Sequence, residues 1–165
     1  MRKQGEKLPT LYASGGSLML RKSMFQALGG FDPIYKPFYG EDSDLGLRAW
    51  RQGWSSYFEP NAYIVHQSRG AIKENNDLRY VKCIRRRNRY LLEWIHLEPY
   101  QLALFSFPIT LLKLIGEALL FDRTNLRGFC LAVPRIPAVV KKRAMLRRSS
   151  SLSLSDVLKR IRAYC

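Results

Sequence analysis

The sequence predicts a mixed α/β region followed by a helical one, and two observations carry this prediction. Residues 8–68 contain short apolar stretches interrupted by glycine and proline, which is typical of brief strands and helices joined by turns. From about residue 76 onward, apolar residues recur at spacings of three and four, the period of amphipathic helices. With 165 residues, 47% of them hydrophobic, the chain can bury one ordinary core.

The first region, residues 1–75, contains two predicted helices and two predicted strands. A short helix is expected over "KSMFQAL", residues 22–28, where two glycines end it, and a second over "EDSDLGLRAWRQG", residues 41–53. The segments "SSYFEP" and "AYIVHQS" are predicted to be strands, with a Pro-Asn turn between them.

The second region, residues 76–148, begins with a strongly basic amphipathic helix in "NDLRYVKCIRRRNRYLLEWIHLE". Lysine and arginine fall largely off its apolar stripe. A serine-rich joint, expected to be flexible, and a short helix make up residues 149–165. The stripe consists of Leu78, Val81, Ile84, Leu91, Leu92 and Ile95, and the basic residues beside it are Lys82, Arg85, Arg86 and Arg89.

The net charge of +15 is concentrated in the second half of the chain. Residues 1–80 hold 11 basic and 8 acidic side chains, whereas residues 81–165 hold 17 and 5. We therefore expect the second half to bind a polyanion, and the two alternatives are an anionic membrane surface and RNA. The sequence has no RNA-binding signature, and an RNA binder has no need of the long apolar segment nearby, so nucleic acid is the less favoured partner.

That apolar segment, "PYQLALFSFPITLLKLIGEALLF", covers residues 99–121 and is about as long as a membrane span. Pro108, Lys113 and Glu117 interrupt it, and a charge near the centre of a span costs about 3 kcal/mol on insertion scales. We expect a helix that lies at the membrane interface or docks on a partner. A full span and an ordinary buried helix are the alternatives.

Three of the few carboxylates, Glu41, Asp42 and Asp44, stand together behind a glycine in "FYGEDSDLGLRAWRQGW". One interpretation is structural, because Asp42 or Ser43 can cap a helix and acidic groups suit the positive end of a helix dipole. The other is chemical, because an ionised carboxylate fixed at a helix N-terminus can remove a proton from an attacking hydroxyl.

The stretch "ASGGSLMLRKSMFQALGGFDPIYKPFYGEDSDLGLRAWRQGW", followed by "PNAYIVHQSRG", resembles the acceptor-side half of a family 2 glycosyltransferase of the rhamnosyltransferase-like group. The matching features are, in order, a pair of glycines, a short helix ending in "GGFD", the Glu-Asp pair, and a histidine after a strand. The resemblance implies an α/β fold: a partial GT-A type (nucleotide-diphospho-sugar transferase) domain followed by a helical, membrane-associating region.

The resemblance also implies site residues. Asp42 would be the general base, and Glu41 would hold the acceptor hydroxyls. Gly15 and Gly16 would line the donor-sugar pocket. His66 would contact a divalent metal, Mg²⁺ or Mn²⁺, whose other ligands lie outside this chain.

Other candidates follow from their own chemistry. Gly40 would let an acceptor approach the backbone closely, and Trp54 could stack on a sugar ring. Trp50 is at helical spacing from Leu47 and is expected in the core, while Asp44 is expected to serve the helix end. A histidine after a strand is also often only hydrogen-bonded within a core.

The chain departs from the family pattern because it has no N-terminal nucleotide-binding half with an Asp-x-Asp motif. We expect a fragment, a subunit completed by a second chain, or an inactive remnant. The expected function is inverting transfer from a nucleotide diphosphate sugar to a glycan or lipid-linked acceptor in cell-surface glycan synthesis. The chain would be peripheral on the cytoplasmic face of the membrane. The alternative is a non-catalytic basic module that binds a membrane surface or a partner.

Overall fold

The computed structural model describes residues 7–65, 72, 75–119 and 123–164, and it divides into two compact units. Unit 1 comprises Met1–Asp32, Glu41–Ser68 and Arg148–Cys165. Unit 2 comprises Pro33–Gly40 and Arg69–Arg147. Each unit combines distant parts of the sequence, so these boundaries differ from the segments expected from composition.

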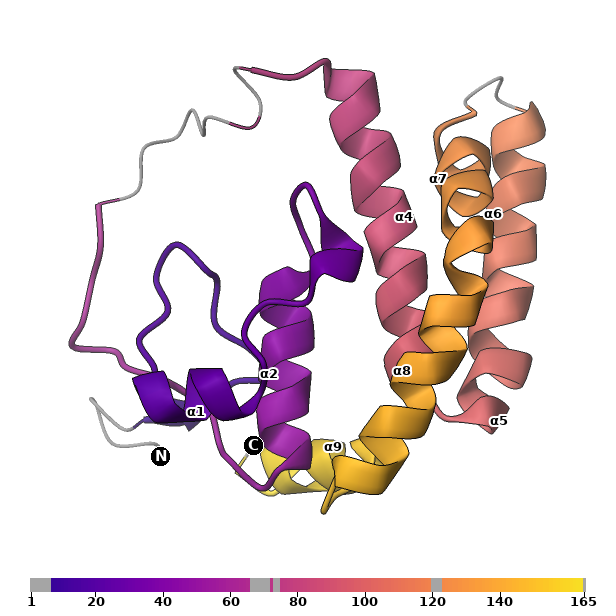
Figure 1. Ribbon diagram of the computed structural model, residues 1–165. Helices are drawn as coiled ribbons and strands as arrows, with labels where there is room; N and C mark the ends of the chain where they lie inside the picture. The colour runs from indigo at the N-terminus through magenta and orange to yellow at the C-terminus, as the bar shows by residue number, and fades with distance from the viewer. Residues whose placement is uncertain (1–6, 66–71, 73–74, 120–122, 165) are drawn as a thin grey trace. The chain divides into compact units, whose positions relative to one another are not determined.

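The described residues of unit 1 form the helices α1 (Lys22–Ala27), α2 (Glu41–Arg51) and α9 (Leu154–Arg162), drawn in Figure 1. They confirm the helices expected in these places. Gly53 ends α2 with φ 80°, a backbone conformation that favours glycine, and its N–H donates to the Trp50 carbonyl at 2.9 Å.

The strands of unit 1 are much shorter than the sequence suggests. β1 (Leu8–Pro9), which was not predicted, pairs antiparallel with β2 (Tyr57–Phe58). The strand expected over "AYIVHQS" is wrong for residues 62–65, and residues 66–68 lie outside the described part. Tyr63 and Val65 are 91% and 92% exposed, so neither pairing nor burial holds this segment extended. The described residues are therefore mostly helical.

The serine-rich segment before α9 is tied to the end of α2. The backbone N–H groups of Ser151 and Leu152 donate to the Arg51 carbonyl at 2.8 and 3.1 Å. Ser153 and Asp156 form a capping box at the start of α9. The hydrogen bond from the Ser153 side chain holds the pKa of the Asp156 carboxyl below its ordinary value. The segment expected to be a flexible joint is thus hydrogen-bonded to the end of α2, although most of its serines are exposed.

The regular elements in the described residues of unit 2 are all helices. In Figure 1, α4, α7 and α6 lie side by side, and α4 and α7 are in direct contact. The elements are η1 (Pro33–Tyr35), α4 (Leu78–His96), α5 (Pro99–Gln101), η2 (Leu102–Ser106), α6 (Phe107–Leu119), α7 (Thr124–Ala132), η3 (Val133–Arg135) and α8 (Ile136–Ser149), whose last residues belong to unit 1.

The apolar stripe predicted on α4 forms much of the core of unit 2. Val81, Ile84, Leu91 and Ile95 are buried, which confirms the stripe at these positions. The prediction is wrong for Leu78, which is 59% exposed at the first turn of the helix. Each fully buried aliphatic side chain contributes about 1.5–3 kcal/mol of hydrophobic stabilisation.

Two polar residues of α4 are buried in a way that the pattern did not indicate. The Asn88 amide donates to the carbonyls of Tyr35, Phe38 and Tyr39 at 2.6, 2.8 and 2.7 Å. Arg87 donates to the Lys36 carbonyl. These bonds satisfy backbone carbonyls of the loop before α2, because buried polar groups without partners are costly.

Gly128 allows α4 and α7 to approach closely. A Cβ at this position would lie 2.6 Å from the Arg86 Cβ, 3.1 Å from the Arg87 backbone nitrogen and 3.2 Å from the Cys83 carbonyl oxygen. Beside this contact, the Phe129 ring packs edge-on against Trp94 with centroids 5.8 Å apart.

The apolar segment forms continuous helix from α5 through η2 to α6. The wide π-turn of η2 ends with the Phe107 N–H bonded to the Leu102 carbonyl, directly before Pro108. Because proline lacks an N–H and clashes with the carbonyl four residues earlier, a locally widened turn accommodates it. By length and composition, Pro99–Glu117 could cross a membrane, with a mean hydropathy of 1.2.

In this helix the apolar side chains are mostly exposed and the buried side chains are polar, the opposite of an amphipathic helix in a water-soluble protein. Only 11% of its most apolar window is buried, so the alternative of an ordinary buried helix is wrong. The buried positions are polar, since Ser106 and Thr110 are 7% and 8% exposed. The exposed residues of its outer face are Leu104, Phe105, Phe107, Ile109, Leu111, Leu112, Ile115 and Leu119.

Candidate active site

The acidic cluster forms the first turn of α2, in unit 1. The helix begins at Glu41, so Asp42 and Ser43 lie within its first turn. Asp42 Oδ1 accepts from the Ser43 backbone N–H at 2.7 Å. Its Oδ2 accepts from the Gly15 N–H at 3.4 Å. The N-terminal end of a helix favours negative side chains at such positions.

Asp42 is half-buried and lines a pocket of about 320 Å³. This volume lies at the lower end of the range for small-molecule sites. Trp54, also half-buried, lines the same pocket, as predicted for a sugar-stacking residue, although stacking itself stays a prediction. Arg21 adds a cation that the sequence analysis did not single out. Other lining residues include Ala13, Met24, Leu45, Ala49 and Tyr57.

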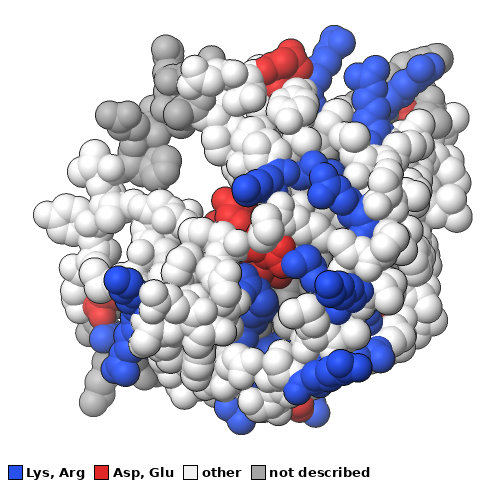
Figure 2. Space-filling model, in the orientation of Figure 1, with Lys and Arg blue, Asp and Glu red and all other residues white. Residues whose placement is uncertain are grey.

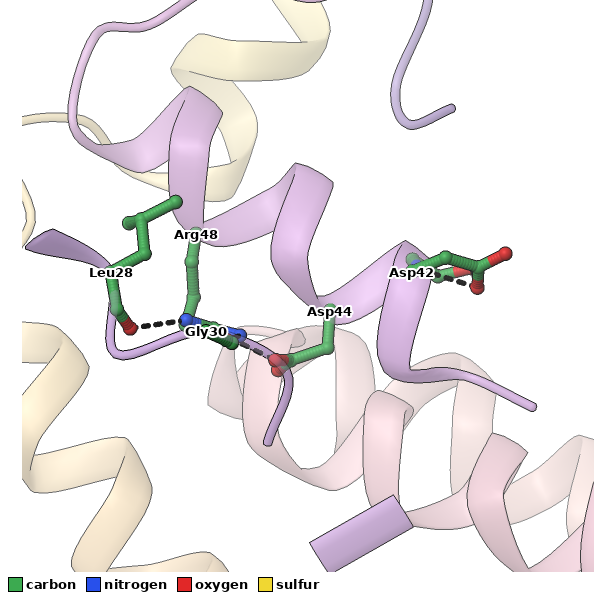
Figure 3. A network of polar contacts seen from close by, with 6 residues as sticks. Leu28, Gly30, Asp42, Asp44 and Arg48 are labelled. Carbon is green, nitrogen blue, oxygen red and sulfur yellow. Dashed lines mark hydrogen bonds and ion pairs between the residues drawn. The ribbon is translucent and has the colours of Figure 1, made fainter. Parts of the chain in front are cut away.

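Asp44 makes different contacts from Asp42. Arg48 Nε donates to Asp44 Oδ2 at 2.7 Å, and the other guanidinium nitrogens donate to the Leu28 and Gly30 carbonyls at 2.6 and 2.8 Å. Figure 3 shows this network on one side of α2, with the Asp42 carboxylate pointing away from it. The structural role expected for Asp44 is confirmed, but it acts through Arg48 rather than at the helix end.

The carboxylate of Glu41 is incompletely satisfied. Its Oε2 is buried and has no hydrogen-bond partner among the described residues. A buried oxygen without a donor costs about 1–3 kcal/mol. Glu41 is not among the residues that line the pocket beside Asp42, so its predicted contact with an acceptor stays a prediction. The preceding Gly40 has φ 94°, and a Cβ there would lie 3.2 Å from the Tyr35 ring. Backbone conformation and packing therefore already require a glycine, whatever its role toward an acceptor.

The structure says less about the other predicted site residues, Gly15, Gly16 and His66. Gly15 and Gly16 form an exposed turn, closed by a bond from the Ser17 N–H to the Ser14 carbonyl at 2.9 Å. The Gly15 N–H donates to Asp42 at 3.4 Å, but neither Gly15 nor Gly16 is among the residues that line the pocket. His66 lies outside the described residues. Within the described ranges, no group of three or more His, Cys, Asp or Glu side chains could hold a metal ion.

The segment of residues 10–12 crosses α2 at Gly46, a pocket-lining residue, and this crossing was missed by the sequence analysis. Trp50 is in the core, as expected, and its indole N–H donates to the Thr10 carbonyl at 2.9 Å. A Cβ on Gly46 would lie 2.5 Å from the Tyr12 Cβ, so only glycine admits this crossing. Neither contact has a sequence signal, whereas the four-residue spacing of Asp44 and Arg48 does.

Comparison with known proteins identifies the family of this chain. The model of glycosyl transferase family group 2 matches residues 2–160. Two N-acetylglucosaminyl-diphospho-decaprenol L-rhamnosyltransferases of Mycobacterium tuberculosis, from strains CDC 1551 / Oshkosh and ATCC 25618 / H37Rv, are each 43% identical to the chain over 58 residues. This match covers 35% of the chain and 19% of each relative. No solved structure matches. Because the family model covers almost the whole sequence, the chain belongs to glycosyl transferase family group 2.

Proposed function

We propose that the chain takes part in inverting transfer of a sugar from a nucleotide diphosphate sugar to a hydroxyl of a lipid-linked glycan acceptor, in cell-surface glycan synthesis. Family membership supports the reaction class, and the printed names of the two relatives support an acceptor joined to a lipid through a diphosphate. The observation that carries the proposal is the position of Asp42, a half-buried carboxylate on the wall of a pocket.

In this reaction Asp42 removes the proton from the acceptor hydroxyl as the oxygen attacks the anomeric carbon and the nucleoside diphosphate leaves. A correctly placed general base contributes roughly 10²–10⁴-fold to a rate. Glu41 accepts a hydrogen bond from the acceptor through the oxygen that has no partner in the described part. Asp44 cannot substitute for Asp42, because its carboxylate is held by Arg48.

We further propose that the nucleotide is held by residues outside this part of the protein, supplied by the same polypeptide or by a second chain. The described residues contain one ribbon of two two-residue strands, which is no scaffold for a nucleotide diphosphate. They also offer no ligand set for the expected Mg²⁺ or Mn²⁺. The metal and a contribution from His66 therefore stay predictions, and no step above depends on them.

The proposed location is the cytoplasmic face of the cell membrane. The outer face of α6 exposes large apolar side chains while its polar side chains are buried, an arrangement that suits a lipid environment better than water. We propose a peripheral, interfacial position for this helix, with a full span as the alternative outcome.

The test compares transfer of labelled sugar into the lipid fraction by membranes containing the wild-type chain or Asp42→Asn. We expect Asp42→Asn to lower transfer by at least roughly 10²-fold without changing thermal unfolding. Asp44→Asn is the matched control, since it should lower thermal stability by weakening the Arg48 network. Undiminished transfer by Asp42→Asn would instead favour the non-catalytic membrane-surface module or an inactive remnant.

A further inference from the structure

The basic side chains of α4 do not form a uniform solvated face. On the face drawn in Figure 2, Lys and Arg side chains clearly outnumber Asp and Glu. Arg87 is buried and bonded to backbone carbonyls, so its role is structural. Arg89 pairs with Glu93 at 2.9 Å. In the described part of the chain, Lys82 and Arg86 have no carboxylate within ion-pair distance, although both line a cavity.

Two adjoining pockets in unit 2 collect these cations. One, of about 450 Å³, is lined by Lys82, Arg85, Arg86, Arg89 and Thr124. The other, of about 260 Å³, shares Arg86 and Arg89 with it. It is also lined by Phe105 of η2, by Ile109 and Lys113 of α6, and by Asn125 of α7. The pair of pockets thus runs from a strongly cationic end to an end that is partly apolar.

The excess of positive charge in these pockets suits an anion that carries several negative charges. Five lining residues are cationic, namely Lys82, Arg85, Arg86, Arg89 and Lys113, whereas Glu93 is the one carboxylate among the lining residues of the two pockets. Glu93 is already engaged, because Ser106 Oγ donates to it at 2.6 Å and Arg89 Nε at 2.9 Å. Arginine forks match phosphate oxygens in geometry as well as charge.

The apolar end of the pockets opens beside the exposed face of α6. Phe105 and Ile109 belong both to the pocket lining and to that face, with 57% and 47% of their surface exposed. A ligand with its phosphates between Arg86 and Lys113 could therefore lay a hydrocarbon chain against the same helix. A free phosphate compound would leave these apolar surfaces in water.

We propose that these two pockets bind the diphosphate of a lipid diphosphate, whose hydrocarbon chain lies along the outer face of α6. This inference rests on the proposed function, for which it provides the acceptor-anchoring site. The site lies wholly in unit 2 and is separate from the pocket around Asp42 in unit 1. Binding is therefore measurable without turnover.

The experiment measures binding of the full chain to phosphatidylcholine vesicles that carry either a polyprenyl diphosphate or phosphatidylglycerol of equal total charge. The wild type should prefer the diphosphate vesicles. Arg86→Gln/Lys113→Gln should reduce this preference by roughly tenfold or more, because a hydrogen bond to a charged group contributes about that much. Arg79→Gln/Arg127→Gln removes the same charge from exposed positions of α4 and α7 and should leave the preference intact.

Three outcomes would overturn the proposal. The first is no preference of the wild type for diphosphate vesicles, and the second is an equal loss of preference in both double variants. The third is binding of soluble inorganic pyrophosphate as tight as that of the lipid, which would assign the pockets to a free diphosphate. Asp42→Asn should bind vesicles like the wild type, so a failed transfer assay and a failed binding assay remain distinguishable.

Discussion

Replacing Gly128 with alanine tests the contact between α4 and α7. The added methyl group would lie 2.6 Å from the Arg86 Cβ and within 3.2 Å of two backbone atoms of α4. Ordinary contacts of a Cβ lie at 3.4–4 Å, and the atoms it would meet are not the ends of flexible side chains. The two helices must therefore move apart, which would also disrupt the aromatic contact between Phe129 and Trp94.

The expected magnitude follows from two opposing effects. Overpacking of a tight core costs about 1–3 kcal/mol, and contact with backbone atoms favours the upper end. Alanine is intrinsically better in a helix than glycine by about 1 kcal/mol, which offsets part of that cost. We expect Gly128→Ala to destabilise unit 2 by about 2 kcal/mol, the difference between these two estimates.

Gly116→Ala is the matched control. Gly116 lies in α6, and a Cβ there would have nothing within 4 Å. Only the propensity effect remains, so this variant should gain up to about 1 kcal/mol. Hydrogen exchange of α4 and α7 amides in the vesicle-bound protein reports local stability, and protection in Gly128→Ala should fall roughly 30-fold. Unchanged or increased protection in Gly128→Ala would refute the close helix contact.

Two further predictions concern polar groups. Asn88→Ala leaves the carbonyls of Phe38 and Tyr39 without their donor, while the Tyr35 carbonyl keeps a longer bond of 3.4 Å from Arg87. The substitution should lower the stability of unit 2 by about 3 kcal/mol, which thermal unfolding measures. An intact melting temperature would show that water replaces the amide. Because the Ser153 hydrogen bond holds the pKa of Asp156 below its ordinary 3.8, the carboxylate should stabilise α9 above about pH 4 and cease to do so as pH falls through the lowered pKa. In Ser153→Ala the acid-induced loss of amide protection in α9 should begin at higher pH, and an unchanged pH profile would contradict the capping box.

The helices were predictable because periodicity and glycine termination are local signals. The α4 stripe followed from spacing and the approximate end of α2 from Gly53, and the Asp44–Arg48 pair could have been found from its four-residue interval. The burial of the polar rather than the apolar face of η2 and α6 was not predictable, because the spacing of apolar residues does not tell which face of a helix packs against the protein. The side on which Ser106 and Thr110 lie is set by α4 and α7.

The strands and the crossing over Gly46 were not predictable for a different reason. Both depend on segments distant in sequence, and β-strand preference is weak without a partner strand. "AYIVHQS" has the composition of a strand, yet Tyr63 and Val65 are exposed. Within the site, the first turn of α2 and its Asp42 were predicted, whereas Arg21 and the Trp50–Thr10 bond were not.

The serine-rich stretch before α9 would ordinarily be trimmed as a disordered tail when a protein is prepared for expression. Here that trimming would strip two N–H donors from the Arg51 carbonyl and remove Leu154 and Val157, which are buried in unit 1. Residues 151–157 thus stabilise the C-terminal end of α2, the helix whose first turn carries Asp42. Shortening them would harm that helix from the opposite end.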